Sequence, residues 1–161
     1  MLNFFKKKTE LTGCRIYAVV DGRLKKLEMV SDPAFAQKIL GDGAAIAPQN
    51  ECVVSPCEGT ITMMYPTLHA FGVKNTDGIE MLVHIGIDTV RLNGKGFKKY
   101  VEEGTIVKPG DKIISFDPRY LQDEDLDMTI MVLFPGIGKN VKILQSGYVR
   151  RGKDPIAVYQ I

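Results

Sequence analysis

The stretch GIEMLVHIGIDTV, residues 78–90, decides the fold. Alternate residues from Met81 to Ile87 are apolar, which is the pattern of a β-strand with one face on a hydrophobic core. His84 lies in the middle of this run on the opposite face, and the chain contains only one other histidine, His69. The stretch therefore predicts a sheet and, on the face away from the core, a candidate functional side chain.

A strong turn signal, NTDG at residues 75–78, separates the two histidines and predicts a β-hairpin. A two-residue loop that begins at Thr76 would place His69 directly opposite His84, with about 5 Å between their Cβ atoms. A loop that begins at Asp77 would leave the two histidines one diagonal step apart, at about 7–8 Å. Both registers put the imidazoles on one face, because a shift of two residues preserves side-chain parity.

The predicted face of the histidine pair is the outer face of the hairpin. On the first strand His69 would share this face with Phe71 and Val73, and the two rings are expected to meet at the solvent boundary. The alternative is a pair of structural histidines with satisfied hydrogen bonds. Convergence of the only two histidines of the chain favours a functional pair.

The rest of the sequence is typical of a single soluble β-rich domain. Its 161 residues are 45% hydrophobic and 25% charged, and a net charge of +2 gives no electrostatic reason to expect nucleic acid as a partner. Short runs of β-forming residues, bounded by Gly, Pro, Asn or Asp, predict strands at 53–55, 60–63, 81–87, 112–116, 128–134 and 156–159. Many short strands at this spacing predict an all-β fold, an antiparallel β-sandwich or barrel.

Only short helices are expected. Asp32 and Pro33 form a helix start that is followed by apolar residues up to Gly41, and a second short helix is expected after Asp117.

We expect a basic, flexible tail at residues 1–10, with at most weak contact with a membrane surface, and a single domain at residues 11–161. Cys14, Cys52 and Cys57 form no CxxC pair and are expected to be reduced. Because no secretory signal or apolar run of about 18 residues is present, a cytoplasmic protein is expected.

The sequence leaves three functions open, two of which use the histidine pair. A neutral imidazole can accept a phosphoryl group and pass it on, while a second imidazole donates a hydrogen bond to the phosphoryl oxygens. A zinc-dependent hydrolase could use His69, His84 and Asp88, but Asp88 lies roughly 13 Å along an extended strand from His84 and needs a bend after Gly86. A lipoyl- or biotinyl-like carrier module is suggested by the turn pattern GTIVKPGDKII at 104–114, which lacks a lysine on a tight hairpin.

Several motifs from about Gly22 to the C-terminus carry a family resemblance. They are SDPAFAQKILGDG (31–43), SPCEGTI (55–61), TLHAF (67–71), LVHIGIDTV (82–90) and LNGKGF (92–97). Through them the chain resembles the glucose-type IIA component of the bacterial phosphoenolpyruvate-dependent sugar phosphotransferase system. The resemblance implies an antiparallel β-sandwich with jelly-roll-like connections and a few short helices.

The resemblance also implies a role for each site residue. His84 would accept phosphate through Nε2 from the phosphocarrier protein HPr and pass it to a cysteine of the IIB domain of a sugar permease. His69 would assist the onward transfer, Thr67 would bond the His69 ring, and the Gly86 carbonyl would bond Nδ1 of His84. No cofactor is required, although His69 and His84 would bind a regulatory zinc ion when a partner supplies a further ligand.

A partner-binding face is expected around the histidines, apolar at its centre and acidic at its rim. Its candidate residues are Asp32, Phe35, Ile39, Leu40, Tyr65, Phe71, Gly86, Asp88 and Val90, and the partners would be HPr, IIB and regulatory targets. Arg91 departs from the family pattern, because many relatives carry glutamate there, so the charge of the rim is expected to differ.

Overall fold

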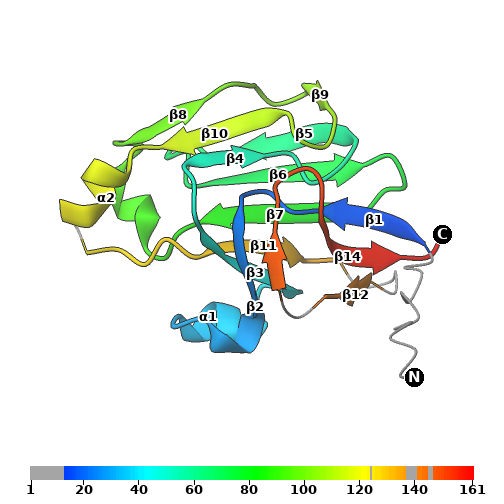
Figure 1. The fold of residues 1–161 in the computed structure, drawn as a ribbon. Helices are drawn as coiled ribbons and strands as arrows, with labels where there is room; N and C mark the ends of the chain where they lie inside the picture. Colours follow the sequence, from blue (N-terminus) through cyan, green and yellow to red (C-terminus); the bar gives the residue numbers. More distant parts are fainter. Residues whose placement is uncertain (1–12, 124, 137–140, 145–146) are drawn as a thin grey trace, which may run out of the picture.

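The protein is built almost entirely from antiparallel strands (Figure 1). The computed structural model describes residues 13–123, 125–136, 141–144 and 147–161. The tail expected at residues 1–10 lies outside this described part of the chain.

The elements are short. The strands are β1 (Cys14–Tyr17), β2 (Gly22–Lys26), β3 (Asp42–Pro48), β4 (Cys52–Val54), β5 (Gly59–Met64), β6 (Ala70–Asn75), β7 (Glu80–Ile85), β8 (Phe97–Lys99), β9 (Ile106–Val107), β10 (Lys112–Phe116), β11 (Ile130–Phe134), β12 (Val141–Ile143), β13 (Gly147–Val149) and β14 (Pro155–Tyr159). The helices are α1 (Pro33–Ala36) and α2 (Pro118–Asp123), with 3-10 turns η1 (Leu27–Met29) and η2 (Thr89–Leu92).

The described strands form one large sheet and two small ones. The large sheet has eight strands in the order β13-β2-β3-β11-β7-β6-β5-β9, and the small sheets have the orders β4-β10-β8 and β1-β14-β12. The paired strands of the large sheet run antiparallel, as do those of the small sheets. This arrangement confirms the predicted all-β antiparallel fold.

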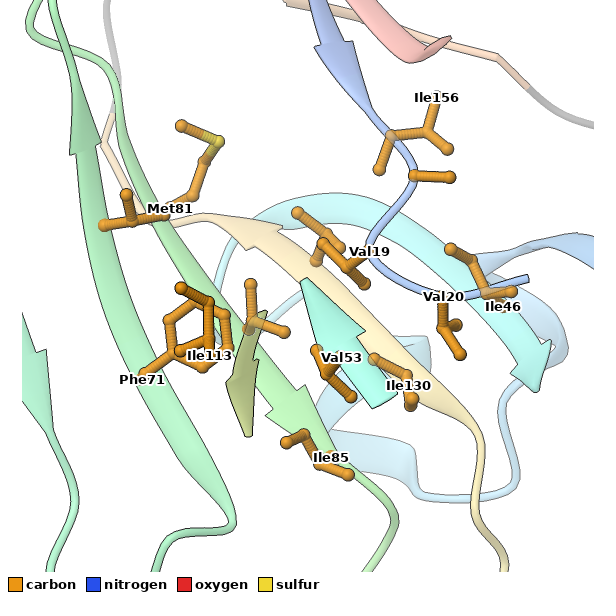
Figure 2. Close-up of a cluster of buried hydrophobic side chains, with 14 of the residues drawn as sticks. Val19, Val20, Ile46, Val53, Phe71, Met81, Ile85, Ile113, Ile130 and Ile156 are labelled. Carbon is orange, nitrogen blue, oxygen red and sulfur yellow. The ribbon is translucent and has the colours of Figure 1, made fainter. Parts of the chain in front are cut away.

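The main core lies where the small sheets face the large one (Figure 2). Phe71 and Ile85 from the large sheet meet Val53 of β4 and Ile113 of β10, and each of these four side chains is fully buried. The arrangement is a sandwich, because one face of the large sheet supplies half of the core and the small sheets supply the rest.

The opposite face of the large sheet carries a second, smaller cluster. Here η1, α1 and the segment between them lie against β3 and β11, and Phe35 of α1 joins Leu27, Ala45, Met131 and Leu133. Asp32 caps α1 by accepting a hydrogen bond from the Ala34 N–H at 2.8 Å. A single short helix turn therefore covers part of the face on which His84 lies.

One strand boundary beside the histidine differs from the sequence expectation in a way that matters for the site. The strand expected at 81–87 ends at Ile85, since Gly86 has a φ of 75° and breaks the alternation of side chains. In consequence Ile87 belongs to the second cluster, whereas Met81, Val83 and Ile85 lie in the main core as predicted.

Candidate functional site: a histidine pair

The hairpin that carries the histidines has a register that neither expected loop gives. Ala70 lies opposite His84, one residue away from both predicted pairings. The Asn75 N–H donates to the Ile79 carbonyl at 3.0 Å, so the loop has three residues and not two. Gly78 closes it with a φ of 84°, which is the left-handed position that favours glycine.

The two rings meet in spite of this register. β6 begins at Ala70, so His69 precedes the strand, and it follows Leu68, whose φ of 55° bends the chain. The ring centroids of His69 and His84 lie 5.1 Å apart with an interplanar angle of 77°. The predicted convergence is thus present, but the bend at Leu68 produces it and strand parity does not: Phe71, predicted to lie beside His69, faces the main core.

Aromatic side chains flank both imidazoles. The Phe35 ring lies against the His84 ring at 4.9 Å between centroids, and the Tyr65 ring lies against the His69 ring at 5.3 Å. His69 is only 6% exposed, which is deeper than the solvent boundary that the sequence suggested, and His84 is partly exposed. The pair therefore lies in a largely apolar setting with His84 on the solvent side.

Each ring has its Nδ1 atom engaged by its own chain. His84 Nδ1 lies 2.8 Å from the Gly86 carbonyl oxygen, and His69 Nδ1 lies 2.6 Å from Thr67 Oγ1. A carbonyl only accepts hydrogen bonds, so His84 Nδ1 carries the proton and Nε2 keeps its lone pair. His84 is thus held in the tautomer that is nucleophilic at Nε2.

The bend after His84 is what presents the Gly86 carbonyl. Gly86 and Asp88 both have positive φ, 75° and 59°, and the buried Thr89 hydroxyl donates to the Ile85 carbonyl. Neither Thr89 nor Leu68 was predicted from the sequence to contribute to the site. Neither a buried threonine nor a non-glycine residue with positive φ has a composition signal.

Burial keeps both imidazoles neutral. The pKa of His84 is lowered from its usual 6.5 to about 4, mainly by desolvation and then by the neighbouring His69. The Gly86 hydrogen bond, Asp32 and Asp88 act in the opposite direction. Desolvation also lowers the pKa of His69. At neutral pH the pair is therefore uncharged and available as nucleophile and hydrogen-bond donor.

The residues expected to bind partners fall into three groups. Ile39, Leu40 and Val90 are exposed at 68%, 42% and 50%. The rings of Phe35 and Tyr65 and the Gly86 carbonyl contact the histidine pair, whereas Asp32 and Asp88 act on His84 electrostatically. Phe71 is a correction: its side chain is fully buried in the main core, so it cannot contact a partner.

Metal chemistry has limited support from the side chains. Within the described residues no group of three or more His, Cys, Asp or Glu side chains is placed to hold a metal ion. The two histidines would supply two of the four ligands that zinc takes in closed sites. The free cysteines do not add to them, and burial raises the pKa of the Cys57 thiol to about 12.

Comparison with known proteins identifies the family. Residues 14–138 match the family model described as phosphoenolpyruvate-dependent sugar phosphotransferase system, EIIA 1. The chain belongs to this EIIA family. It is therefore a phosphoryl-transfer component of the sugar phosphotransferase system, and neither the zinc hydrolase nor the lipoyl-like carrier is supported.

Individual relatives agree with this EIIA assignment. The chain is 42% identical over 158 residues to the glucose-specific EIIA component of Buchnera aphidicola, covering 96% of this chain and 94% of that one. It is 47% identical over 120 residues to the Staphylococcus epidermidis glucose-specific EIIA component, with 74% and 72% covered. The glucose permease IIA of Mycoplasma capricolum superimposes with a TM-score of 0.84 at 33% identity, over 91% of this chain and 95% of that one.

One relative is much longer than this EIIA chain. The glucose-specific EIICBA component of Streptococcus pneumoniae is 42% identical over 145 residues, which are 89% of this chain but 19% of that protein. In the described part of the present chain, no helix combines the length and the apolar character needed to cross a membrane.

Proposed function

We propose that His84 Nε2 accepts the phosphoryl group from phosphorylated HPr and passes it to a cysteine of a IIB domain, and that His69 assists the second transfer. The observation that carries this assignment is the hydrogen bond from His84 Nδ1 to the Gly86 carbonyl at 2.8 Å. Because Nδ1 is occupied, only Nε2 can attack phosphorus.

The electrostatics of His84 support its role as acceptor. A pKa lowered to about 4 means that the ring is neutral at physiological pH, so no proton has to leave Nε2 before attack. The new bond from Nε2 to phosphorus forms as the bond from phosphorus to the donor atom of HPr breaks. In the second step the Nε2–phosphorus bond breaks as the cysteine thiolate of IIB attacks.

His69 suits the role of a hydrogen-bond donor to the phosphoryl oxygens, and Thr67 suits the role of fixing the tautomer of the His69 ring. When Thr67 Oγ1 donates to His69 Nδ1, the proton of the His69 ring is on Nε2, and the His69 and His84 rings lie 5.1 Å apart. A donor held beside a transferring phosphoryl group stabilises the charge on its oxygens, and phosphoryl transfer depends mainly on positioning and electrostatics of this kind.

The surroundings of His84 suit transient docking. Ile39, Leu40 and Val90 expose apolar surface, while Asp32 and Asp88 lie close enough to raise the pKa of His84 electrostatically. This apolar surface with an acidic rim would suit an HPr surface that carries basic residues, and charge complementarity chiefly accelerates association. We propose that the transfer takes place in the cytoplasm, that no cofactor takes part, and that a regulatory zinc ion would bind His69 and His84 only with ligands from a partner.

The direct test is phosphorylation by phosphoenolpyruvate, enzyme I and HPr, followed by mass spectrometry and ³¹P NMR. The expected product is one acid-labile, base-stable phosphate on Nε2 of His84, absent from the His84→Ala variant and present on the His69→Gln variant. Phosphate on His69, on Nδ1 of His84 or on a lysine would contradict the proposal.

A further inference from the structure

The Gly86–Ile87 peptide unit is held from both sides. Its carbonyl accepts from His84 Nδ1 at 2.8 Å, and its N–H, on Ile87, donates to the Asp127 carbonyl at 2.8 Å. A peptide unit is planar and rigid, so the position of its N–H fixes the direction of its carbonyl. The preceding N–H, on Gly86, donates to the Thr129 carbonyl at 3.0 Å.

The carbonyls that receive these two N–H groups belong to one small turn. Oδ1 of Asp127 accepts the Thr129 N–H at 2.9 Å and the Thr129 hydroxyl at 2.7 Å. A side-chain carboxylate that accepts the N–H two residues on is an Asx turn, which locks the backbone between the two residues. The Asp127 carboxylate therefore sets the geometry of the turn on which the His84 hydrogen-bond acceptor rests.

The second carboxylate oxygen reaches a different part of the fold. Oδ2 of Asp127 accepts from the Ser31 hydroxyl at 3.1 Å. Ser31 directly precedes Asp32, the cap of α1, and α1 carries Phe35 against the His84 ring. One carboxylate thus links the backbone that holds the His84 proton with the segment that covers the His84 ring.

We propose that Asp127 is a positioning residue for phosphoryl transfer. Its carboxylate holds both the Gly86 carbonyl and the segment that carries Phe35 in position against the His84 ring. This inference rests on the proposed function of His84 and deepens it. Asp127 itself is exposed and touches neither imidazole, so its effect passes through Gly86 and Phe35. No sequence motif marks it, because a surface aspartate beside a strand is common.

The test compares Asp127→Ala and Asp127→Asn with a matched control. Asp111→Ala is suitable, because Asp111 also closes a turn by accepting a backbone N–H, that of Lys108 at 2.8 Å, on a loop that the histidine network does not use. Two quantities are measured: kcat and KM for phosphoryl transfer from phosphorylated HPr, and the share of His84 with the proton on Nδ1, from ¹H–¹⁵N NMR of the unphosphorylated protein.

We expect Asp127→Ala to lower kcat about tenfold with KM within about twofold, the loss expected when a hydrogen bond to the reacting group loosens. The same variant should show a mixture of His84 tautomers. Asp127→Asn keeps Oδ1 as an acceptor and should recover most of the activity, and Asp111→Ala should match the wild type in both measurements.

Three outcomes overturn the proposal: a wild-type kcat in Asp127→Ala, an unchanged His84 tautomer in Asp127→Ala, or an equal loss of kcat in Asp111→Ala. A fall in melting temperature alone, with kcat per folded molecule unchanged, identifies Asp127 as merely structural. If instead the wild-type protein carries no phosphate on His84, the proposed function fails, and the tautomer comparison still decides whether Asp127 positions the ring.

Discussion

The ring of Phe35 covers the ring of His84, with 4.9 Å between centroids and an interplanar angle of 59°. Phe35 is itself only 6% exposed, because it joins the second apolar cluster on the sheet face that His84 shares. The contact removes water from one side of the imidazole. Desolvation is the largest cause of the low pKa of His84, so this relationship can be tested directly.

Replacing Phe35 with Ala should raise the pKa of His84 from about 4 towards its usual 6.5, because water would reach the ring and favour the charged form. An NMR titration of the ring measures the shift. Ile39→Ala is the control, since Ile39 is 68% exposed and should leave the His84 pKa unchanged. An identical His84 titration in the wild type and in Phe35→Ala would show that this ring does not desolvate the imidazole.

The low pKa of His84 also predicts how stability depends on pH. Between pH 6.5 and about 4 the unfolded state binds a proton at this residue and the folded state does not, so protonation favours unfolding. The contribution of His84 to stability is therefore complete above pH 6.5 and is lost as the pH falls towards 4. The melting temperatures of the wild type and of His84→Gln, each measured as a function of pH, should converge as the pH falls over this range. A difference that stays constant with pH would contradict the lowered pKa of His84.

The second histidine has a separable role. His69→Gln should still accept phosphate on His84, because the Gly86 hydrogen bond at Nδ1 of His84 is intact. Delivery to IIB should fall on the order of 100-fold, the typical cost of losing one donor to a developing charge. Single-turnover assays with radiolabelled phosphate separate the two steps. Normal delivery by this variant would remove His69 from the mechanism.

The bend at Gly86 can be tested by substitution. In Gly86→Ala a new Cβ would lie 2.5 Å from Thr89 Cγ2 in a residue with a φ of 75°. We expect the free energy of unfolding to fall by more than the roughly 1–3 kcal/mol that backbone strain alone would cost. Gly104→Ala is the control, since its φ is 86° and no atom lies within 4 Å of the Cβ position.

Adding Thr89→Ser to Gly86→Ala removes the clashing methyl group and keeps the hydroxyl that donates to Ile85. In urea unfolding, the double variant should recover part of the stability loss that exceeds that of Gly104→Ala, since Met128 Sδ at 3.1 Å and the Asp127 carbonyl oxygen at 3.3 Å still crowd the new Cβ. Equal losses in Gly86→Ala and Gly104→Ala would mean that the contact with Thr89 carries no cost.

Substitutions at docking residues and at core residues should affect different quantities, KM in the first case and stability in the second. Ile39→Ser should raise KM for phosphorylated HPr several-fold and leave stability near that of the wild type, because this side chain is already 68% exposed. Phe71→Ala should instead cost about 3–5 kcal/mol of stability, since the ring is fully buried. Kinetics and urea unfolding on both variants test the assignment, and an unchanged KM in Ile39→Ser would exclude Ile39 from the docking face.

Local patterns predicted the strands that carry apolar alternation. The strand expected at 112–116 is β10 to the residue, and the expected helix start at Asp32 is the observed cap. β3 has no such pattern, because its sequence DGAAIAP is rich in small residues. Close packing requires the glycine among them, since a Cβ at Gly43 would lie 2.1 Å from the Val132 carbonyl of β11. Strand formation at β3 is therefore set by its neighbour and not by local propensity.

The histidine pair was predictable, but its geometry was not. The turn signal at 75–78 predicted the hairpin, yet the sequence does not distinguish a loop of two residues from one of three. The left-handed conformation of Leu68, which brings His69 to His84, occurs where the Leu68 N–H closes a turn onto the Tyr65 carbonyl at 2.8 Å, and no glycine marks that position in the sequence. Phe71 was placed on the wrong face because the parity of β6 was extended through that bend to His69.

The tie between His84 Nδ1 and Gly86 has a consequence for the relay cycle. If phosphate arrives at Nε2 and leaves from Nε2, the imidazole never has to flip about its Cβ–Cγ bond. The phosphorylated and unphosphorylated proteins then share one His84 rotamer, and each phosphoryl transfer proceeds without reorganisation of the side chain that carries the phosphoryl group.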